Sequence, residues 1–394
     1  MKRDIEEREY FRSLAQQHWD SLGKPIDSLG VLEQHVTKLC MIERTAQPHI
    51  SRRALAVLCA DHGCVREGVT QTDSSVTRIV AENFARGLTT TSVLARQFAV
   101  DLFPIDVGML AASSEPMPTS ALASAGVPSR EGDAGRASDS EMISSSGCQH
   151  EEEKQGSVAL RTDLVNDRCL QHGSGDIAIE PAMSEEVGER ALALGRRLVR
   201  ELKTQGYDIL LTGEMGIGNT TPTSALFSAY LGLPVEETVG RGAGLSDEGL
   251  ERKRDCVRRA LRRVGHKKAK QLLFELGGLE IATMAGMFLG AVEEQMPIVI
   301  DGAISTAAAL AASRIYEEEE AVADVTLASH VSKDGAARKA LEALGLRAII
   351  DADMSLGEGS GAVLLMPMLD AALAVYRGMG SFEDIHVEAY QRFN

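Results

Sequence analysis

Short apolar runs alternate with longer amphipathic stretches along most of the chain. The apolar runs have the length of strands, and we predict strands at residues 54–60, 100–106, 207–212, 297–301, 322–327 and 346–350. Helical periodicity fills the gaps, and we predict helices at residues 74–97, 184–205, 247–264, 279–294, 305–316 and 335–344. Strands that alternate with helices need crossover connections. The pattern therefore predicts an α/β fold, with a doubly wound, mostly parallel sheet covered on both faces.

Both chain ends and one internal segment fall outside this alternation. Residues 1–50 and 361–394 are predicted to be helical, and we expect them to form a small helical domain beside an α/β substrate-binding domain at 51–360. Residues 112–157 are rich in Ser, Gly and acidic residues and poor in large apolar side chains. Such a segment buries too little area to offset its ordering entropy, so we predict a mobile insertion there.

Composition limits the partners of the protein. The 41 Lys and Arg against 57 Asp and Glu give a net charge of −16 over 394 residues, which argues against nucleic acid or an anionic membrane as a partner. No apolar run reaches the length of about 18 residues needed to span a membrane, and the first residues are charged, so we expect a cytoplasmic protein. The six cysteines and nine histidines show no ligand spacing, and we expect reduced thiols, no metal and no cofactor.

The most informative stretch is residues 211–226, which reads LTGEMGIGNTTPTSAL. A predicted strand runs into closely spaced glycines and then into a helix, for which Pro222 would be a suitable first residue. Glycines let the backbone approach a ligand, and the amides of a helix N-terminus suit a phosphate. The residues expected to bind it are Gly216, Gly218, Asn219 and Thr220. A glycine-rich turn alone is equally often structural, but the acid Glu214 at its mouth favours a functional site.

A second acid, Glu358, lies between Gly357 and Gly359 at the start of an apolar helix. An acid at this place complements the helix dipole, which is a purely structural role. Alternatively, the flanking glycines leave room for a planar substrate, and burial raises the pKa of the carboxyl group towards that of a useful base. The pattern alone does not choose between the two.

Other polar residues also follow predicted strands or begin predicted helices. Asp61 and His62 follow the first strand and Asp301 follows the fourth, and a histidine in such a place is more often structural than catalytic. Asp247 is a candidate helix cap. Lys253, two turns inside that helix, either lies on a solvated face or pairs with a phosphate.

A family resemblance joins these motifs. The sequence resembles the nicotinate-nucleotide–dimethylbenzimidazole phosphoribosyltransferases of cobalamin nucleotide-loop assembly, over about residues 21–380. The matching text is Lys24-Pro25 with SLG and LE, ADHG…EGV…VT…AEN…RG at 60–87, GSGDIA…PAMS at 173–184, GEMGIGNTTP at 213–222, VGRGAGL, GGLEIATMAGMFLGA at 277–291, DGAISTAAAL at 301–310, Ser329-His330 and LGEGSGA at 356–362. GEMGIGNTTP and LGEGSGA together are highly specific.

The resemblance implies a reaction and a set of roles. The family transfers 5-phosphoribosyl from nicotinate mononucleotide to 5,6-dimethylbenzimidazole, without a metal, on a six-stranded homodimeric fold. Its general base corresponds to Glu358, its second acid to Glu214 and its phosphate-binding lysine to Lys253. Residues implied for the base pocket are Thr72, Val80, Gly357 and Gly359.

Three positions depart from the family pattern. Ser355 stands where an arginine is common, and Thr72 and Val80 stand where the family often has Ser and Gln. The apolar Val80 keeps open a related transferase that uses another base or a phenol as acceptor. A non-catalytic nucleotide-binding relative is a further alternative, although a pure binding site gains little from two acids.

Overall fold

The computed structural model of the chain describes residues 2–111, 159–333 and 336–392. Contacts within the chain define one large unit, residues 1–110 with 159–394, and the separate segment 111–158. The insertion predicted at 112–157 lies outside the described residues, so its mobility stays a prediction.

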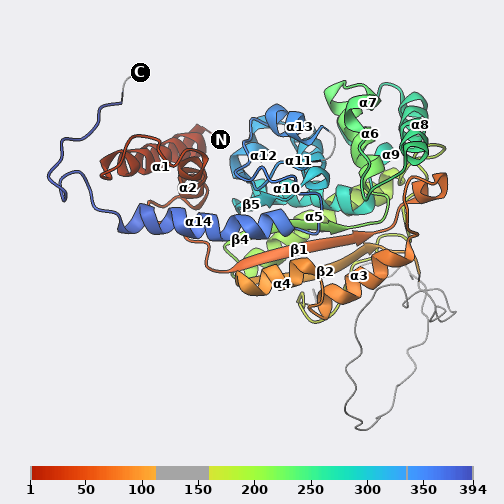
Figure 1. Ribbon diagram of the computed structural model, residues 1–394, viewed down its shortest axis with the longest axis horizontal. Coiled ribbons are helices and arrows are strands. Elements are labelled where there is room, and N and C mark those ends of the chain that lie inside the picture. The colour runs from red at the N-terminus through yellow and green to blue at the C-terminus, as the bar shows by residue number, and fades with distance from the viewer. Residues whose placement is uncertain (1, 112–158, 334–335, 393–394) are drawn as a thin grey trace, which may run out of the picture. The chain divides into compact units, whose positions relative to one another are not determined.

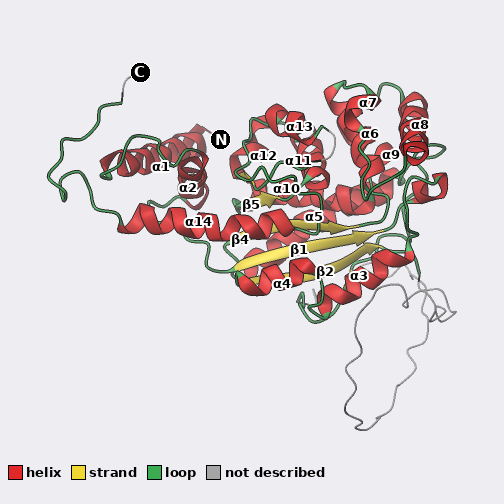
Figure 2. Ribbon diagram, in the orientation of Figure 1, coloured by secondary structure: helices red, strands yellow, loops and turns green. Residues whose placement is uncertain are grey.

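Six parallel strands form the centre of the large unit, in the order β3-β2-β1-β4-β5-β6. The strands are β1 (Arg53–Ala60), β2 (Val100–Gly108), β3 (Asn166–Asp167), β4 (Ile209–Met215), β5 (Ile298–Ile300) and β6 (Thr326–Ala328). Figure 2 shows the helices that lie between the strands in sequence and cover the sheet from both sides. The predicted doubly wound α/β fold is confirmed.

Alternate residues of β1 point to opposite faces of the sheet and enter two hydrophobic clusters. Ala54 and Leu58 belong to one cluster, whereas Leu55 and Val57 belong to the other. The first cluster is built mainly with α5 (Glu185–Thr204), α6 (Thr220–Leu231), α7 (Val235–Thr238), α8 (Asp247–Val264), α9 (Ala269–Leu276), α10 (Leu279–Glu294), α11 (Ala303–Ile315), α12 (Glu319–Val325) and α13 (Ala337–Ala343). The second is built mainly with α1 (Lys2–Ser21), α2 (Val31–Glu43), α3 (Ser75–Ala85), α4 (Thr90–Gln97) and α14 (Ser360–Gly378).

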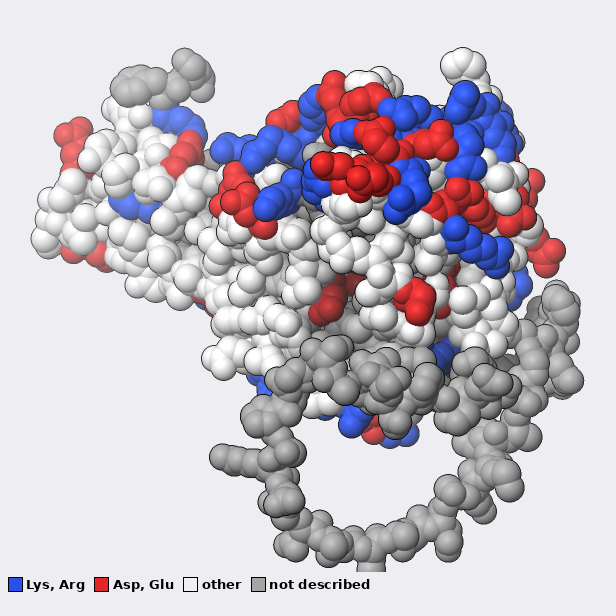
Figure 3. Space-filling model, turned by 45° about the vertical axis from the view of Figure 1, so that its right-hand side comes forward, with Lys and Arg blue, Asp and Glu red and all other residues white. Residues whose placement is uncertain are grey.

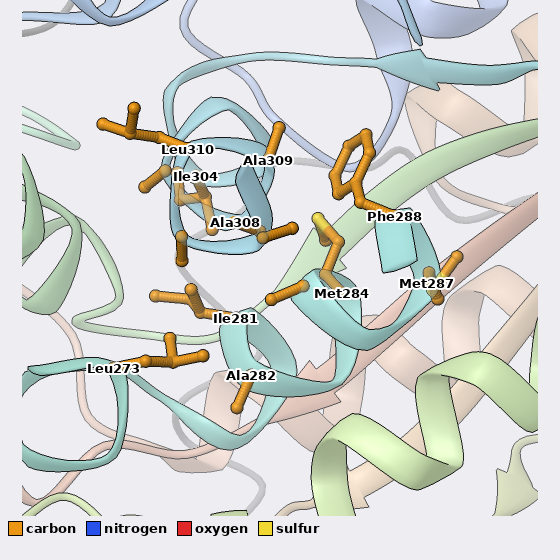
Figure 4. Packing of buried hydrophobic residues seen from close by; sticks show 14 of the residues in the cluster. Leu273, Ile281, Ala282, Met284, Met287, Phe288, Ile304, Ala308, Ala309 and Leu310 are labelled. Carbon is orange, nitrogen blue, oxygen red and sulfur yellow. The ribbon is translucent and has the colours of Figure 1, made fainter. Parts of the chain in front are cut away.

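Helix α10 lies at the centre of the first cluster. Figure 4 shows Ile281 and Met284 of α10 facing Ala308 of α11. On its other side α10 approaches α5 so closely that a Cβ atom on Gly286 would lie 2.8 Å from the Cα atom of Leu192. Tight packing on both sides fixes the amino end of α10, which lies next to the candidate site described below.

The two ends of the chain come together in the fold. Figure 1 shows α1 and α2, in red, beside the carboxyl end of the blue α14, and the rings of Trp19 and Tyr376 meet edge to face with centroids 4.8 Å apart. A bridge between Leu22 and Ser381 links the segments that follow α1 and α14. The division into a helical domain of residues 1–50 plus 361–394 and a larger domain stays a prediction.

Among the described residues, α14 is long and apolar enough to cross a membrane by length and composition. Half of that stretch is buried inside the protein, and buried core helices pass the same test. The observation is weak evidence for a membrane span.

Three predictions of secondary structure are wrong. Residues 346–350 do not form a strand, since only Ile350 makes an isolated bridge, to His330. Residues 322–327 are mostly helical, because α12 continues to Val325 before β6 begins. Short apolar runs fit a buried helix as well as a strand, which explains the error at 322–327. The helix predicted at 74–97 is two helices, α3 and α4, separated by a turn at Gly87 with φ +72°.

Two predicted helix starts also differ from the structure. Pro222 is the third residue of α6, which begins at Thr220. The cap of α8 is Ser246, whose hydroxyl accepts a hydrogen bond from the Gly249 amide, and Asp247 is the first helical residue.

Candidate active site

The candidate site lies where the order of the strands changes direction, between β1 and β4. From β1 the chain continues to β2 and β3 on one side of the sheet, and from β4 it continues to β5 and β6 on the other. Ligands of open α/β sheets bind outside the carboxyl ends of the strands at such a point. The residues that follow these ends include His62 after β1, the glycine turn after β4 and Asp301 after β5.

A cavity of about 280 Å³ opens at this point. Its lining includes the predicted site residues Thr72, Glu214, Gly216, Gly218, Asn219, Thr220, Gly357 and Glu358. Part of its wall is apolar and consists of Val69, Met215, Ile217, Ile304 and Leu356. The cavity therefore offers acids, a glycine-rich backbone and apolar side chains to one ligand.

Glu214 and Glu358 line the same cavity because the segments that carry them cross. A Cβ atom on Gly213 would lie 2.8 Å from the carbonyl oxygen of Glu358, and one on Gly357 would collide with Oε1 of Glu214. Any larger residue at either position would push the segments apart. The glycines beside the two acids thus bring the acids together.

Glu214 is almost fully enclosed. Its side chain is 7% exposed, and its Oε2 accepts a hydrogen bond from the Asn219 side-chain amide. Burial raises the pKa of Glu214 to about 8, and the charges of Asp301 and Glu280 contribute in the same direction. In the free protein this carboxyl group is therefore mostly protonated at neutral pH.

Glu358 occupies an unusual backbone position, with φ +62°. The Thr91 hydroxyl donates a hydrogen bond of 3.0 Å to its Oε2. Burial raises the pKa of Glu358, whereas the bond from Thr91 lowers it. A carboxyl group with a raised pKa has the basicity that a general base needs near neutral pH.

Sequence reasoning assigned no role to three neighbours of these acids: Thr91, Asp301 and His330. Asp301 is 2% exposed, and burial raises its pKa to about 7 although three backbone amides donate to it. His330 follows β6 and lines the cavity, and burial lowers its pKa to about 4, so its ring is neutral. The position at a strand end was a usable signal for Asp301 and His330, whereas Thr91 lies in a helix without any motif.

Contacts with α3 and β1 hold the glycine turn between β4 and α6 in place. The Ile217 amide donates to the Thr77 hydroxyl oxygen at 3.2 Å, and Gly218 has φ +96°, which favours glycine. A Cβ atom on Gly216 would lie 2.6 Å from the Ala60 carbonyl oxygen. The turn therefore packs directly on the end of β1 and leads into the amino end of α6.

A buried ion pair lies beneath this turn. His62 Nε2 is 2.9 Å from Glu280 Oε1, and both side chains are buried. Burial lowers the pKa of His62, but the charge and hydrogen bond of Glu280 outweigh it and raise the pKa above its usual value. The pair connects the end of β1 with the first turn of α10.

Lys253 does not lie on a solvated face, as one interpretation of the sequence had it. The residue is 1% exposed, and its Nζ donates to the Thr220 hydroxyl at 2.8 Å and to the Gly240 carbonyl at 3.1 Å. Lys253 lines a small space of about 20 Å³ that shares Thr220 with the main cavity. Its ammonium group thus lies behind the start of α6.

Two of the residues predicted for the base pocket, Val80 and Gly359, do not line the cavity. Val80 is half-buried and packs against the hydrophobic cluster that α3, α4 and α14 help to build. Gly359 precedes α14 with φ +87°, and a Cβ atom there would meet the Leu55 side chain. Thr72 and Ser355 do line the cavity.

Arginines of α8 form ion pairs with acidic residues near the surface. Arg254, Arg258 and Arg259 pair with Glu251, Glu236 and Glu67. Figure 3 shows Lys and Arg intermingled with Asp and Glu over the upper part of the face in view.

The described residues include no group of three or more His, Cys, Asp or Glu side chains arranged to hold a metal ion. Among the described cysteines, Cys40, Cys59, Cys64 and Cys256 are free thiols.

Comparisons with known proteins agree over nearly the whole chain. A family model described as "Phosphoribosyltransferase" matches residues 6–387. A nicotinate-nucleotide–dimethylbenzimidazole phosphoribosyltransferase of Acetivibrio thermocellus is 36% identical over 380 residues, 96% of this chain and 94% of that protein. The Escherichia coli SMS-3-5 protein of the same name is 37% identical over 371 residues, 93% of this chain and 89% of that protein. The crystal structure of CobT from Thermus thermophilus matches with a TM-score of 0.79 at 34% identity, covering 97% of this chain and 100% of that one.

Proposed function

The chain belongs to the nicotinate-nucleotide–dimethylbenzimidazole phosphoribosyltransferase family, and from that premise we propose how its cavity carries out the reaction. The protein transfers the 5-phosphoribosyl group of nicotinate mononucleotide to 5,6-dimethylbenzimidazole, a step of cobalamin biosynthesis. The products are α-ribazole 5′-phosphate and nicotinate.

The observation that carries the proposal is the meeting of two acids, Glu214 and Glu358, in one cavity beside the glycine turn. A buried and a half-buried carboxyl group next to an anion site are unfavourable unless they act on the ligand. A protein that only bound a nucleotide would gain nothing from them. This argues against the non-catalytic alternative.

The leaving group determines what Glu214 does. Nicotinate leaves as a neutral ring nitrogen from a pyridinium cation, so its departure needs no acid. Positive charge spreads over C1′ and the ring oxygen as the bond to nicotinate breaks, as in glycoside transfer. An ionised Glu214 close to C1′ stabilises that charge in a site with little water.

The acceptor determines what Glu358 does. One ring nitrogen of the benzimidazole forms the new bond to C1′ while the C1′–nicotinate bond breaks. The acceptor then carries a positive charge until its other nitrogen loses a proton. Glu358 takes this proton, which leaves a neutral α-ribazole 5′-phosphate base.

The phosphate acts as a handle and does not react. The backbone of residues 216–220 faces the cavity at the amino end of α6, where the helix dipole favours an anion. The Lys253 ammonium group, held by Thr220, adds a positive charge behind this backbone. No step of this mechanism uses a metal or a cofactor.

The acceptor is selected mainly by shape. The apolar part of the wall, which includes Ile304 and Leu356, favours a flat aromatic ring. These side chains form no hydrogen bonds that would distinguish one ring substituent from another. Another benzimidazole, adenine or a phenol is therefore the second candidate acceptor. Competition among these acceptors, with products separated by mass spectrometry, decides between them, and exclusive use of dimethylbenzimidazole removes the alternative.

Assembly and location belong to the same proposal. We expect a homodimer in the cytoplasm, as the family resemblance and the sequence composition suggest. Light scattering of the purified protein at micromolar concentration tests the dimer, and a monomeric mass would contradict it.

Nicotinate release by the purified protein, with nicotinate mononucleotide and dimethylbenzimidazole as substrates, tests the proposed function. The Glu358→Gln variant keeps an oxygen for the Thr91 hydroxyl but cannot accept the proton, so we expect its kcat to fall by roughly 10²–10⁴-fold. A matched control is Glu342→Gln on the exposed face of α13, which should keep wild-type turnover. Near wild-type rates for Glu358→Gln would refute its role, and no nicotinate release by the wild type would refute the function.

A further inference from the structure

Asp301 directs both carboxylate oxygens at the turn that carries Glu358. Its Oδ1 accepts hydrogen bonds from the amides of Gly361, at 2.7 Å, and Ala362, at 3.1 Å. Its Oδ2 accepts one from the amide of Gly359 at 3.2 Å. Asp301, which directly follows β5, therefore caps the start of α14, although nearly 60 positions separate it from that helix.

The turn needs such support because its backbone is strained. Gly357, Glu358 and Gly359 have φ values of +77°, +62° and +87°, three left-handed residues in succession. A glutamate in this conformation is unfavourable and persists only where its surroundings hold it. Amide hydrogen bonds to an ionised carboxylate are among the stronger holds available.

Asp301 is itself fixed on both sides. Its own amide donates to the Ser305 hydroxyl at 2.8 Å, and its carbonyl accepts from the Ser329 hydroxyl at 2.9 Å. The His330 ring lies next to it, with Nδ1 3.9 Å from Oδ1, and packs against Gly361. The first turn of α11 and the end of β6 thus fix the backbone of Asp301, whose carboxylate holds the turn.

We propose that Asp301 is a positioning residue, which acts through the turn 357–359 to aim the Glu358 carboxylate at the acceptor. Its oxygens are committed to backbone amides, so it acts on the reaction through Glu358 and not at C1′. This inference rests on the proposed function, since it needs Glu358 to be the base.

The Asp301→Asn variant tests it with a minimal change of shape. Asparagine keeps one oxygen for Gly361 and Ala362 but turns an amide group towards the Gly359 amide, so two donors face each other next to Glu358. We expect kcat to fall on the order of 10²-fold, the effect of a misplaced catalytic group, with the KM for nicotinate mononucleotide changed less than about threefold.

Asp106→Asn is the matched control. Asp106 lies near the end of β2, is buried, and accepts hydrogen bonds from the amides of Gly108 and Met109 at 3.0 and 2.8 Å, but it does not line the cavity. We expect this variant to lose stability and keep its kcat. An equal fall of kcat in both variants would mean that Asp301 is merely structural and would overturn the proposal.

A double-mutant cycle separates positioning from general damage. If Asp301 acts through the base, adding Asp301→Asn to Glu358→Gln costs little further activity, because the group it positions is already disabled. Losses that multiply would overturn the proposal.

Hydrogen exchange of the peptide spanning residues 356–363 gives a readout that needs no turnover. We expect Asp301→Asn to speed exchange in this peptide and to leave residues 209–215 of β4 unchanged. Unchanged exchange at 356–363 would overturn the positioning role even if turnover is too low for the cycle. Absence of nicotinate release by the wild type would instead refute the proposed function, so the two failures are distinguishable.

Discussion

The strongest prediction concerns Glu214, because its environment opposes ionisation more than that of an ordinary carboxyl group. An unfolded glutamate ionises near its usual pKa of 4.5, whereas the folded protein holds the pKa of Glu214 at about 8. Below pH 4.5 the group is protonated in both states and has no effect on the free energy of unfolding. As the pH rises from 4.5 through 8, the folded state resists ionisation and the wild type loses stability.

The magnitude follows from the shift. The difference between about 8 and 4.5 is about 3.5 pKa units, and at ~1.4 kcal/mol per unit the full loss approaches ~5 kcal/mol above pH 8. Glu214→Gln keeps an oxygen for the Asn219 amide and carries no charge, so it avoids this loss. We expect the variant to match the wild type near pH 5 and to exceed its stability by up to ~5 kcal/mol near pH 8.5.

Urea unfolding at pH 5, 6, 7, 8 and 8.5 measures this difference. The exposed control Glu342→Gln, on α13, should follow the wild type at every pH. A stability difference between Glu214→Gln and the wild type that stays constant over this range would show that Glu214 ionises normally, and the reasoning about burial would fail.

Two further predictions follow from neighbouring contacts. Thr91→Val removes the hydrogen bond that lowers the pKa of Glu358, so the acidic limb of the kcat/KM profile should move to higher pH; an unchanged limb would exclude Glu358 as the titrating group. Glu280→Gln leaves His62 without its buried partner and should cost roughly 3–5 kcal/mol of unfolding free energy at neutral pH. Because the pair raises the pKa of His62, the stability that the pair contributes is present at low pH and is lost as the pH rises through this raised pKa. The cost of Glu280→Gln in urea unfolding should therefore shrink at alkaline pH. A cost independent of pH would contradict this.

The central strands could be predicted from the sequence because burial on both faces leaves a continuous apolar run. The runs at 54–60 and 207–212 became β1 and β4, and the crossover helices between them follow the 3.6-residue period. The edges of the sheet could not be predicted in this way. β3 has only two residues, and β6 follows α12 without a break, so neither has a pattern of its own.

Some residues of the candidate site could also be predicted from the sequence, and others could not. Glycines at fixed places around an acid mark both Glu214 and Glu358, because a close backbone approach leaves a visible trace in the sequence. Asp301 and Thr91 make their contacts with residues far along the chain. The strand-end position marked Asp301 as a polar candidate without indicating its partners, and no local pattern marked Thr91. Val80 is a different case: the family resemblance placed it in the base pocket, but its side chain packs against a hydrophobic cluster and does not line the cavity.

The pKa values explain how an acidic cavity accepts a phosphorylated substrate in a protein of net charge −16. In the free protein the pKa of Glu214 is about 8, so this carboxyl group is mostly neutral at neutral pH and adds little negative charge to the cavity. The substrate brings a dianionic phosphate to the glycine turn and a pyridinium cation to the acids. A cation within a few ångströms favours the ionised form of a carboxyl group. In the proposed mechanism Glu214 is therefore neutral while the phosphate approaches and becomes charged next to C1′, where positive charge develops as nicotinate leaves.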